Sequence, residues 1–286
     1  MTKTRLSKRR IKKSPKRRGL WLFFALCFLL FVLGYFLFVF QKPFFAKDRN
    51  LSIAVVNQDG SVDVMVVNPI AETITTITIP GNTEVVAARQ LGTWRIKSIW
   101  KLGEQEKLSG QLLVETITKT FNFPTEAWTD GRKTNLTVLD KVRLEFFTRA
   151  VKAASKNNIN LGQTGALVQT KLVDGEVGYK LTGKTPPSIL AIFGETNISQ
   201  EGFLVTIEDA TGVAGVARQV GKIIEVLGAK VAVISESKED VEGCVVVGPE
   251  SVTLEKISRI FSCKKEKQPE EKSVKIILGR SFGERF

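Results

Sequence analysis

The sequence predicts a mixed α/β (α+β) fold that is anchored in a membrane. Three observations lead to this prediction. Residues 20–40 form a stretch of 21 residues without a charge, directly after a strongly basic head. Between residues 61 and 80, after an apolar run at 51–57, apolar and polar residues alternate with the period of half-buried strands. Between residues 203 and 279, strand and helix patterns follow one another in the order βαββαβ, which is typical of a two-layer α/β domain.

The apolar stretch, residues 20–40, predicts a transmembrane helix. A helix rises about 1.5 Å per residue, so this stretch matches the roughly 30 Å of bilayer hydrocarbon. A cleaved signal peptide is the alternative, but its apolar core has about 7–15 residues and is followed by small residues. Here the core is longer, and Ala46 is the only small residue in the bulky stretch that follows it. We therefore expect an uncleaved anchor.

The basic head, residues 1–19, predicts the orientation of this anchor. It carries ten lysines and arginines and no acidic residue, whereas only Lys42 and Lys47 follow closely on the other side. Because the positive flank of a span stays in the cytoplasm, everything after Pro43 is expected outside it. The chain is thus predicted to be a single-pass protein of the cytoplasmic membrane.

Composition narrows the classes of function. The net charge is +13, but the head supplies +10 of it, so nucleic-acid binding by the outer part is not predicted. The chain has no histidine, which removes the commonest general base and zinc ligand. No CxxC pair occurs, and Cys27 lies inside the apolar stretch. We expect neither a metal nor a cofactor.

Residues 48–156 are expected to form the first outward domain, with an α/β fold. It begins with a meander of three strands, of which the first is apolar throughout and the next two alternate like half-buried strands. The predicted strands cover 51–57, 61–69 and 72–80. Apolar residues at helical spacing predict helices over 104–122 and 136–155, with a short strand at 124–128 between them. The apolar face of the second helix consists of Leu139, Val142, Phe146, Ala150 and Ala154.

The remainder divides at residue 203. Residues 157–202 show no clear period, and we expect a loosely structured connector with a hairpin around Asp174-Gly175. Residues 203–282 are expected to form a small domain in which a four-stranded sheet carries two helices on one face. Its predicted strands cover 203–208, 230–235, 243–248 and 273–279, and its helices cover 213–227 and 251–262.

Two cysteines of this second domain are expected close together. Cys244 begins a strand, and Cys263 follows the helix that returns after the turn at 248–250. Two alternatives remain: a disulfide, which we favour, or two separately buried thiols. The disulfide would close a loop of about 20 residues and stabilise the fold by roughly 3 kcal/mol.

The turn at 209–215 joins a strand to a helix and contains Thr211, Gly212 and Gly215. One interpretation is a phosphate cradle at the helix N-terminus. The other is a tight turn in which Thr211 caps the helix and the glycines allow close packing. We favour the second, because the complete GxGxxG pattern is absent.

Basic and aromatic residues alternate between positions 89 and 101. They are Arg89, Trp94, Arg95, Lys97, Trp100 and Lys101. One hypothesis is a basic, aromatic surface for a glycan or a lipid phosphate. The other is that they are solvated charges over a small apolar cluster. The pattern alone leaves both open.

Two parts of the chain resemble known families. The segment VTIEDATGVAGVARQVGKIIEVLGAKV (205–231) and the closing IILGRSF (276–282) resemble the LytR C-terminal domain. Residues 51–150 look like a degenerate and shortened LytR-CpsA-Psr (LCP) domain, through VMVVNP (64–69), TITTITIP (73–80) and LLVETITKTFNFPTEAW (112–128). The resemblance implies a bacterial envelope protein. Members of the LCP family transfer glycopolymers from polyprenyl-pyrophosphate carriers to peptidoglycan.

The resemblance also implies how the family holds its substrate, with arginines and acidic residues around pyrophosphate and metal. The family's IPRDT is IPGNT here, so Gly81 and Asn82 stand at the arginine and aspartate positions. No arginine occurs between Arg149 and Arg218. Since guanidinium groups supply the bidentate bonds that phosphate chemistry needs, we expect no transferase activity.

We therefore predict a non-catalytic module that binds cell-wall glycopolymer or has a structural role. Its expected partners are the cytoplasmic membrane and peptidoglycan or an anionic cell-wall polymer. The alternative is a residual LCP-type glycopolymer-to-peptidoglycan phosphotransferase, which would use Mg²⁺ or Mn²⁺. The sequence predicts no particular oligomeric state.

Overall fold

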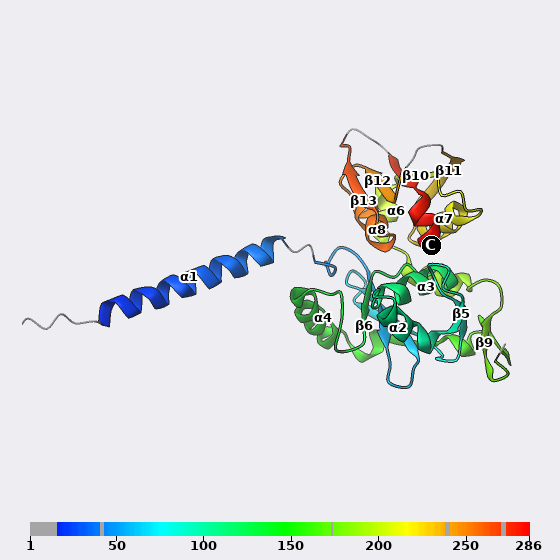
Figure 1. The fold of residues 1–286 in the computed structure, drawn as a ribbon, viewed down its shortest axis with the longest axis horizontal. Helices are drawn as coiled ribbons and strands as arrows, with labels where there is room; N and C mark the ends of the chain where they lie inside the picture. The colour runs from blue at the N-terminus through cyan, green and yellow to red at the C-terminus, as the bar shows by residue number, and fades with distance from the viewer. Residues whose placement is uncertain (1–15, 41–42, 173, 238–240, 270–272) are drawn as a thin grey trace, which may run out of the picture. The chain divides into compact units, whose positions relative to one another are not determined.

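The computed structural model describes residues 16–40, 43–172, 174–237, 241–269 and 273–286 (Figure 1). The chain divides into two units, and residues 43–286 form one of them. The other unit contains helix α1 (Lys16–Phe40), which includes the predicted apolar stretch. Over the part of the chain that the structure describes, no helix is both long enough and apolar enough to cross a bilayer. The anchor stays a prediction.

A five-stranded sheet organises residues 43–202, which we call the first lobe. Its strand order is β6-β1-β2-β3-β7. The strands are β1 (Leu51–Val56), β2 (Val62–Asn68), β3 (Thr73–Ile79), β6 (Ala127–Thr129) and β7 (Lys156–Asn160). The first three form the predicted antiparallel meander, whereas β6 and β7 lie parallel to β1 and β3. Every second residue of β2 up to Val66 is buried, as the alternating pattern predicts.

The helix predicted over 104–122 is two helices, so this prediction is wrong in its first part. The observed helices are α2 (Ile96–Gln105) and α3 (Gln111–Phe121), and the strand pair β4 (Glu84–Val86) and β5 (Thr93–Arg95) precedes them. The break comes where Lys107 and Ser109 have positive φ angles of 59° and 49°. Gly110 then packs against Trp128, where a Cβ atom would lie 2.3 Å from the ring. Only a glycine fits this approach.

Helix α4 (Val138–Ala150) ends before the predicted boundary and turns a different face to the core. Val142 and Phe146 were expected to be buried but are exposed, whereas Leu144 and Phe147 pack towards Phe45. Thr137 and Asp140 form a capping box at the start of the helix. The carboxylate of Asp140 also accepts the N–H of Phe45 at 2.8 Å, which fixes the rotation of α4 on the sheet.

Residues 157–202 are not the loosely structured connector that the sequence predicts. They supply most of β7, and the hairpin of β8 (Leu167–Lys171) and β9 (Val177–Leu181) forms around Asp174-Gly175 as expected. Helices α5 (Pro187–Leu190) and α6 (Thr196–Glu201) follow. Leu161, Ile189 and Phe193 belong to the core of the first lobe. Elements of three to six residues are too short to show a period in the sequence.

The second lobe, residues 203–286, has five strands rather than four. Their order is β11-β10-β14-β12-β13. They are β10 (Leu204–Asp209), β11 (Lys230–Glu236), β12 (Cys244–Gly248), β13 (Lys264–Lys267) and β14 (Ser273–Leu278). Helices α7 (Val216–Val226) and α8 (Val252–Ile260) share one core with Val205, Ile207, Val246 and Ile276 of the sheet. The sequence predicted neither β13 nor the terminal helix α9 (Arg280–Arg285).

A disulfide joins Cys244 of β12 to Cys263 after α8, with the two Cα atoms 4.6 Å apart. The thiol of Cys27 is free. Of the two alternatives that the sequence left open, the structure has the disulfide.

A carboxylate on α8 makes the stability of the second lobe depend on pH. Burial would raise the pKa of Glu255, but Lys265 and Arg259 outweigh it and lower the pKa from 4.5 to about 2. The stabilisation is therefore present above about pH 4.5 and is lost as the pH falls towards 2. We expect Glu255→Gln to lower the free energy of unfolding by about 1–2 kcal/mol at pH 7, after solvent screening. Urea unfolding at pH 7 and pH 3 measures this difference, which should shrink by roughly half at pH 3 and vanish only below about pH 2.

Glu266→Gln is the matched control, because Glu266 pairs with an exposed lysine, Lys264, and should change the unfolding free energy little. An equal loss for Glu255→Gln at both pH values would contradict the electrostatic explanation.

Candidate functional site

The two arginines of the predicted basic and aromatic stretch are held by acidic residues of the protein. Arg89 forms two hydrogen bonds with the carboxylate of Glu115, at 2.7 and 2.9 Å, and Arg285 reaches the same carboxylate at 3.1 Å. Arg95 pairs with Asp174 and Glu176 of the β8–β9 hairpin. These guanidinium groups connect segments of the fold, so they are not presented together to a ligand.

The other four residues of the stretch separate into two groups. Trp100 packs edge-on against Trp128 at 5.4 Å between ring centroids and belongs to the core of the first lobe. Trp94 is 41% exposed, and Lys97 and Lys101 are exposed on α2. Neither lysine forms an ion pair with a residue that the structure describes. We call Trp94, Lys97 and Lys101 the α2 face; the two lysines lie on one side of the helix because they are four residues apart.

The IPGNT turn is closed by contacts within the protein. A Cβ atom at Gly81 would lie 2.6 Å from the carbonyl oxygen of Gly60. The Asn82 side-chain amide donates to the carbonyl of Val177 at 3.2 Å, and the backbone carbonyl of Asn82 accepts the N–H of Tyr179. At this position the backbone of the neighbouring turn occupies the space that a longer side chain would need.

The turn before α7 satisfies its polar groups locally. The Asp209 carboxylate accepts the N–H and the O–H of Thr211, at 3.0 and 2.6 Å. The Thr211 hydroxyl accepts the N–H of Val213 at 3.0 Å. Helix α7 begins only at Val216, and its N-cap is Gly215, which has no capping side chain. The expectation that Thr211 caps the helix is therefore wrong, and Thr211 and Gly212 (φ 70°) instead form a separate turn.

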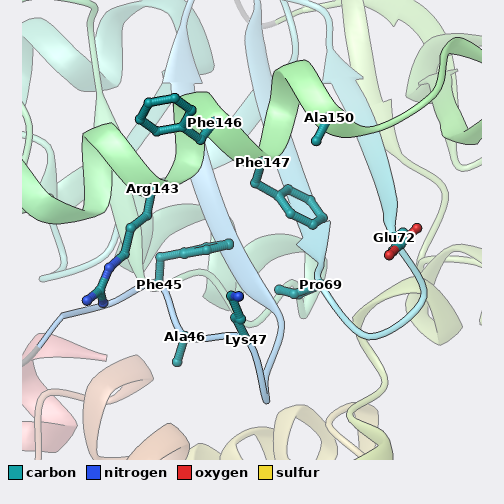
Figure 2. Close-up of a pocket in the computed structure, with 9 residues that line it drawn as sticks. All are labelled: Phe45, Ala46, Lys47, Pro69, Glu72, Arg143, Phe146, Phe147 and Ala150. Atoms are coloured by element: carbon teal, nitrogen blue, oxygen red, sulfur yellow. The ribbon is translucent and has the colours of Figure 1, made fainter.

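A cavity of about 730 Å³ opens beside α4 (Figure 2). Figure 2 shows Arg143 and Phe147 projecting from the helix towards the segment that contains Phe45 and Lys47, whereas Phe146 lies at the outer side of the helix. The rings of Phe45 and Phe147 lie 5.6 Å apart. The whole lining consists of Phe45, Ala46, Lys47, Pro69, Glu72, Arg143, Phe146, Phe147 and Ala150. We call this the α4 cavity; the sequence did not predict it, because Phe146 was assigned to the core.

Three charged side chains are buried together between the lobes. The Lys256 ammonium lies 2.5 Å from Glu126 Oε1, 2.8 Å from Glu195 Oε1 and 2.5 Å from the carbonyl of Asn50. Burial raises the pKa of Glu126; burial alone would lower the pKa of Lys256, but the two carboxylates outweigh it and raise that pKa. The side chains of Lys256, Glu126 and Glu195 are buried and present no atom to solvent, so we assign this cluster a structural role.

Among the residues that the structure describes, no group of three or more acidic or cysteine side chains is arranged to hold a metal ion. Within the described residues, the α2 face and the α4 cavity both present exposed cationic and aromatic side chains to solvent. The first was predicted in part from the sequence and the second was not.

No protein-family model matches the chain, and no curated protein matches it. Over about half of its length, the mixed α/β fold is similar to solved structures of LytR-CPS2A-psr family proteins. It is the family that residues 51–150 resemble in sequence.

One of these structures is the crystal structure of B. subtilis TagT, with 13% identity, a TM-score of 0.39 and coverage of 49% of this chain and 88% of that chain. Another is the LytR-CPS2A-psr family protein YwtF (TagT) with bound octaprenyl pyrophosphate lipid, with 13% identity, a TM-score of 0.38 and coverage of 50% and 88%. A third is the Lin1025 protein from Listeria innocua, with 10% identity, a TM-score of 0.36 and coverage of 47% and 91%. At these identities the similarity concerns the fold alone.

Proposed function

We propose that this chain is a single-pass bacterial envelope protein that binds an anionic cell-wall polymer outside the cytoplasm and does not transfer it. The basic head of residues 1–19 and the uncharged stretch of residues 20–40 support the anchor and its orientation. The resemblance of residues 205–231 and 276–282 to the LytR C-terminal domain supports the location in the envelope.

One observation carries the non-catalytic part of this proposal. The backbone of Gly60 lies so close to Gly81 that a Cβ atom there would meet its carbonyl oxygen at 2.6 Å. The family's arginine therefore has no place in this turn without movement of the neighbouring hairpin. Arg89 and Arg95, which could replace its charge, are held by Glu115, Asp174 and Glu176.

The α2 face is the surface that we assign to the polymer. An indole ring stacks on the apolar side of a sugar, and two exposed ammonium groups attract phosphate along the polymer. This arrangement requires no deprotonation, metal ion or bond cleavage, and it suits reversible binding. Its affinity should fall as the salt concentration rises, because exposed charges are screened.

We expect Lys97→Ala/Lys101→Ala to weaken the binding of poly(glycerol phosphate) about tenfold at low salt, since each exposed charge pair contributes about 0.2–1 kcal/mol. Cosedimentation of the full chain in nanodiscs with the immobilised polymer measures this affinity. Lys222→Ala/Lys230→Ala removes the same charge from exposed positions of the second lobe and should leave the affinity nearly unchanged. Equal losses in both double variants would remove the α2 face from the proposal.

The same preparation tests the absence of transfer. Incubation with a polyprenyl-pyrophosphate-linked glycopolymer, peptidoglycan and Mg²⁺ or Mn²⁺ should release no polyprenyl phosphate. Metal-dependent release would establish the alternative, a residual phosphotransferase, and contradict the non-catalytic proposal.

A further inference from the structure

Helix α4 presents an apolar stripe to the outside of the molecule. Val138, Val142 and Phe146 follow one another at a spacing of four residues, and their exposed fractions are 73%, 45% and 70%. A helix on a globular lobe usually directs its only apolar stripe to the core. Here Leu144 and Phe147 already do so, and the outer stripe is additional. Because Phe146 also lines the α4 cavity, stripe and cavity form one contiguous apolar surface.

Cations surround this surface. Lys47 and Arg143 line the cavity, and neither forms an ion pair with any residue described by the structure. Lys141 is exposed on the same helix. Of the acidic groups, Glu145 is paired with Arg149, and Glu72 is the one carboxylate among the described residues that line the cavity. The combination of an apolar stripe with unpaired lysine and arginine is typical of a helix that lies in the interface of an anionic membrane.

The covalent chain limits how far this surface can be from the predicted anchor. Phe40 ends the predicted span, and Lys47 follows seven residues later. Seven extended residues reach at most about 25 Å. The headgroup layer is therefore within reach of Lys47 if residues 20–40 span the bilayer. This step rests on the anchor of the proposed function.

We propose that the outer stripe of α4 and the α4 cavity form a docking surface for the anionic bilayer in which the chain is anchored. Phe146, Val142 and Val138 enter the boundary between headgroups and acyl chains, to a depth of about 5–10 Å. Lys47 and Arg143 then lie at the level of the lipid phosphates. The surface holds residues 43–286 at the membrane instead of leaving them on a free tether.

Photocrosslinking of the full chain in nanodiscs tests this proposal. A photoreactive p-benzoyl-phenylalanine replaces Phe146 in one sample and Trp94, an exposed aromatic residue of the α2 face, in the matched control. With phosphatidylglycerol mixed into phosphatidylcholine, we expect lipid adducts at position 146 and few at position 94. Adduct formation should fall about 10- to 30-fold in Lys47→Gln/Arg143→Gln, because each basic residue at an anionic surface contributes about fivefold in affinity. Nanodiscs of phosphatidylcholine alone should give the same fall.

Four patterns of adducts would overturn the proposal. The first is equal lipid adducts at positions 146 and 94, and the second is adducts at position 146 whose amount does not change with lipid charge or in the double variant. The third is adducts between two copies of the chain. The fourth is adducts that appear only when polyprenyl phosphate is added. The third would make the stripe an interface between copies, and the fourth would make the cavity a carrier-lipid site. A chain that does not stay with the nanodiscs refutes the anchor, and with it this inference. A chain that stays but gives no adduct refutes the docking surface alone.

Discussion

Replacing Lys256 by methionine is expected to lower the free energy of unfolding by about 3–5 kcal/mol, because two buried carboxylates lose their cation. The Lys256 ammonium is 2% exposed and contacts Glu126, Glu195 and the carbonyl of Asn50. Methionine keeps most of the packed volume, so the expected loss measures uncompensated charge rather than a cavity. Denaturant unfolding of the full chain in detergent, followed by tryptophan fluorescence, measures it.

Two further variants separate charge from packing. Lys256→Met combined with Glu126→Gln and Glu195→Gln removes all three charges, and it should recover most of the lost stability. Lys264→Met changes a lysine whose side chain is 75% exposed, and it should cost less than about 0.5 kcal/mol. If the single Lys256→Met variant unfolded like the wild type, the cluster would not contribute to stability.

The cluster also explains why residues 43–286 form one compact unit rather than two independent domains. Asn50, Glu126 and Glu195 belong to the first lobe, and Lys256 belongs to α8 of the second. Arg285 adds a second connection, because it binds Glu115 and the carbonyl of Phe261. Removing one partner from a buried ion pair costs more free energy than forming the pair contributes. Arrangements of the lobes that separate these partners are therefore disfavoured, and one arrangement is fixed.

Elements with one buried face could be predicted from the sequence, and elements held by their backbone could not. The strands β2 and β3 bury alternate residues over most of their length, and the period of two shows in their sequence, whereas β1 is a short apolar run that buries four residues in succession. Strand β13 has the sequence KKEK and buries no side chain; its pairing with β12 is made by backbone groups. Periodicity carries no information about such a strand.

The orientation of α4 shows a second limit. Its sequence contains two apolar stripes, one with Val142 and Phe146 and one with Leu144 and Phe147. The spacing of residues within the helix does not indicate which of the two stripes is buried. The hydrogen bond from the Phe45 N–H to Asp140, 95 residues away in the chain, decides which stripe faces the sheet. A contact at that sequence separation leaves no local signal.

The candidate site shows the same limit. The sequence identifies basic and aromatic residue types, but whether their side chains are available to a ligand depends on distant partners. Arg89 is held by Glu115, 26 residues on, and Arg95 by Asp174 and Glu176, 79 and 81 residues on. Lys97 and Lys101 stay available because no described carboxylate reaches them, and Trp94 is 41% exposed although its indole N–H donates to the carbonyl of Leu91. The charge pattern of a segment thus predicts candidates, and the fold selects among them.

Removing the disulfide between Cys244 and Cys263 is expected to lower the free energy of unfolding by about 3 kcal/mol, mainly because the unfolded chain regains the freedom of the closed loop. Cys244→Ser/Cys263→Ser and treatment with dithiothreitol should give similar losses in urea unfolding. Cys27→Ser is the matched control, since its thiol is free and outside residues 43–286. A loss in that control equal to the loss in the double variant would contradict the assignment.

The redox state of this pair in cells bears on the orientation of the whole chain. Disulfides persist outside the cytoplasm, whereas the cytosol keeps thiols reduced. If residues 43–286 face outward, alkylation of intact cells with a thiol reagent should leave Cys244 and Cys263 unmodified until a reductant is added. Both thiols reacting without reductant would place the second lobe in a reducing compartment, against the predicted direction of the anchor. The same bond that stabilises the second lobe therefore reports on which side of the membrane that lobe lies.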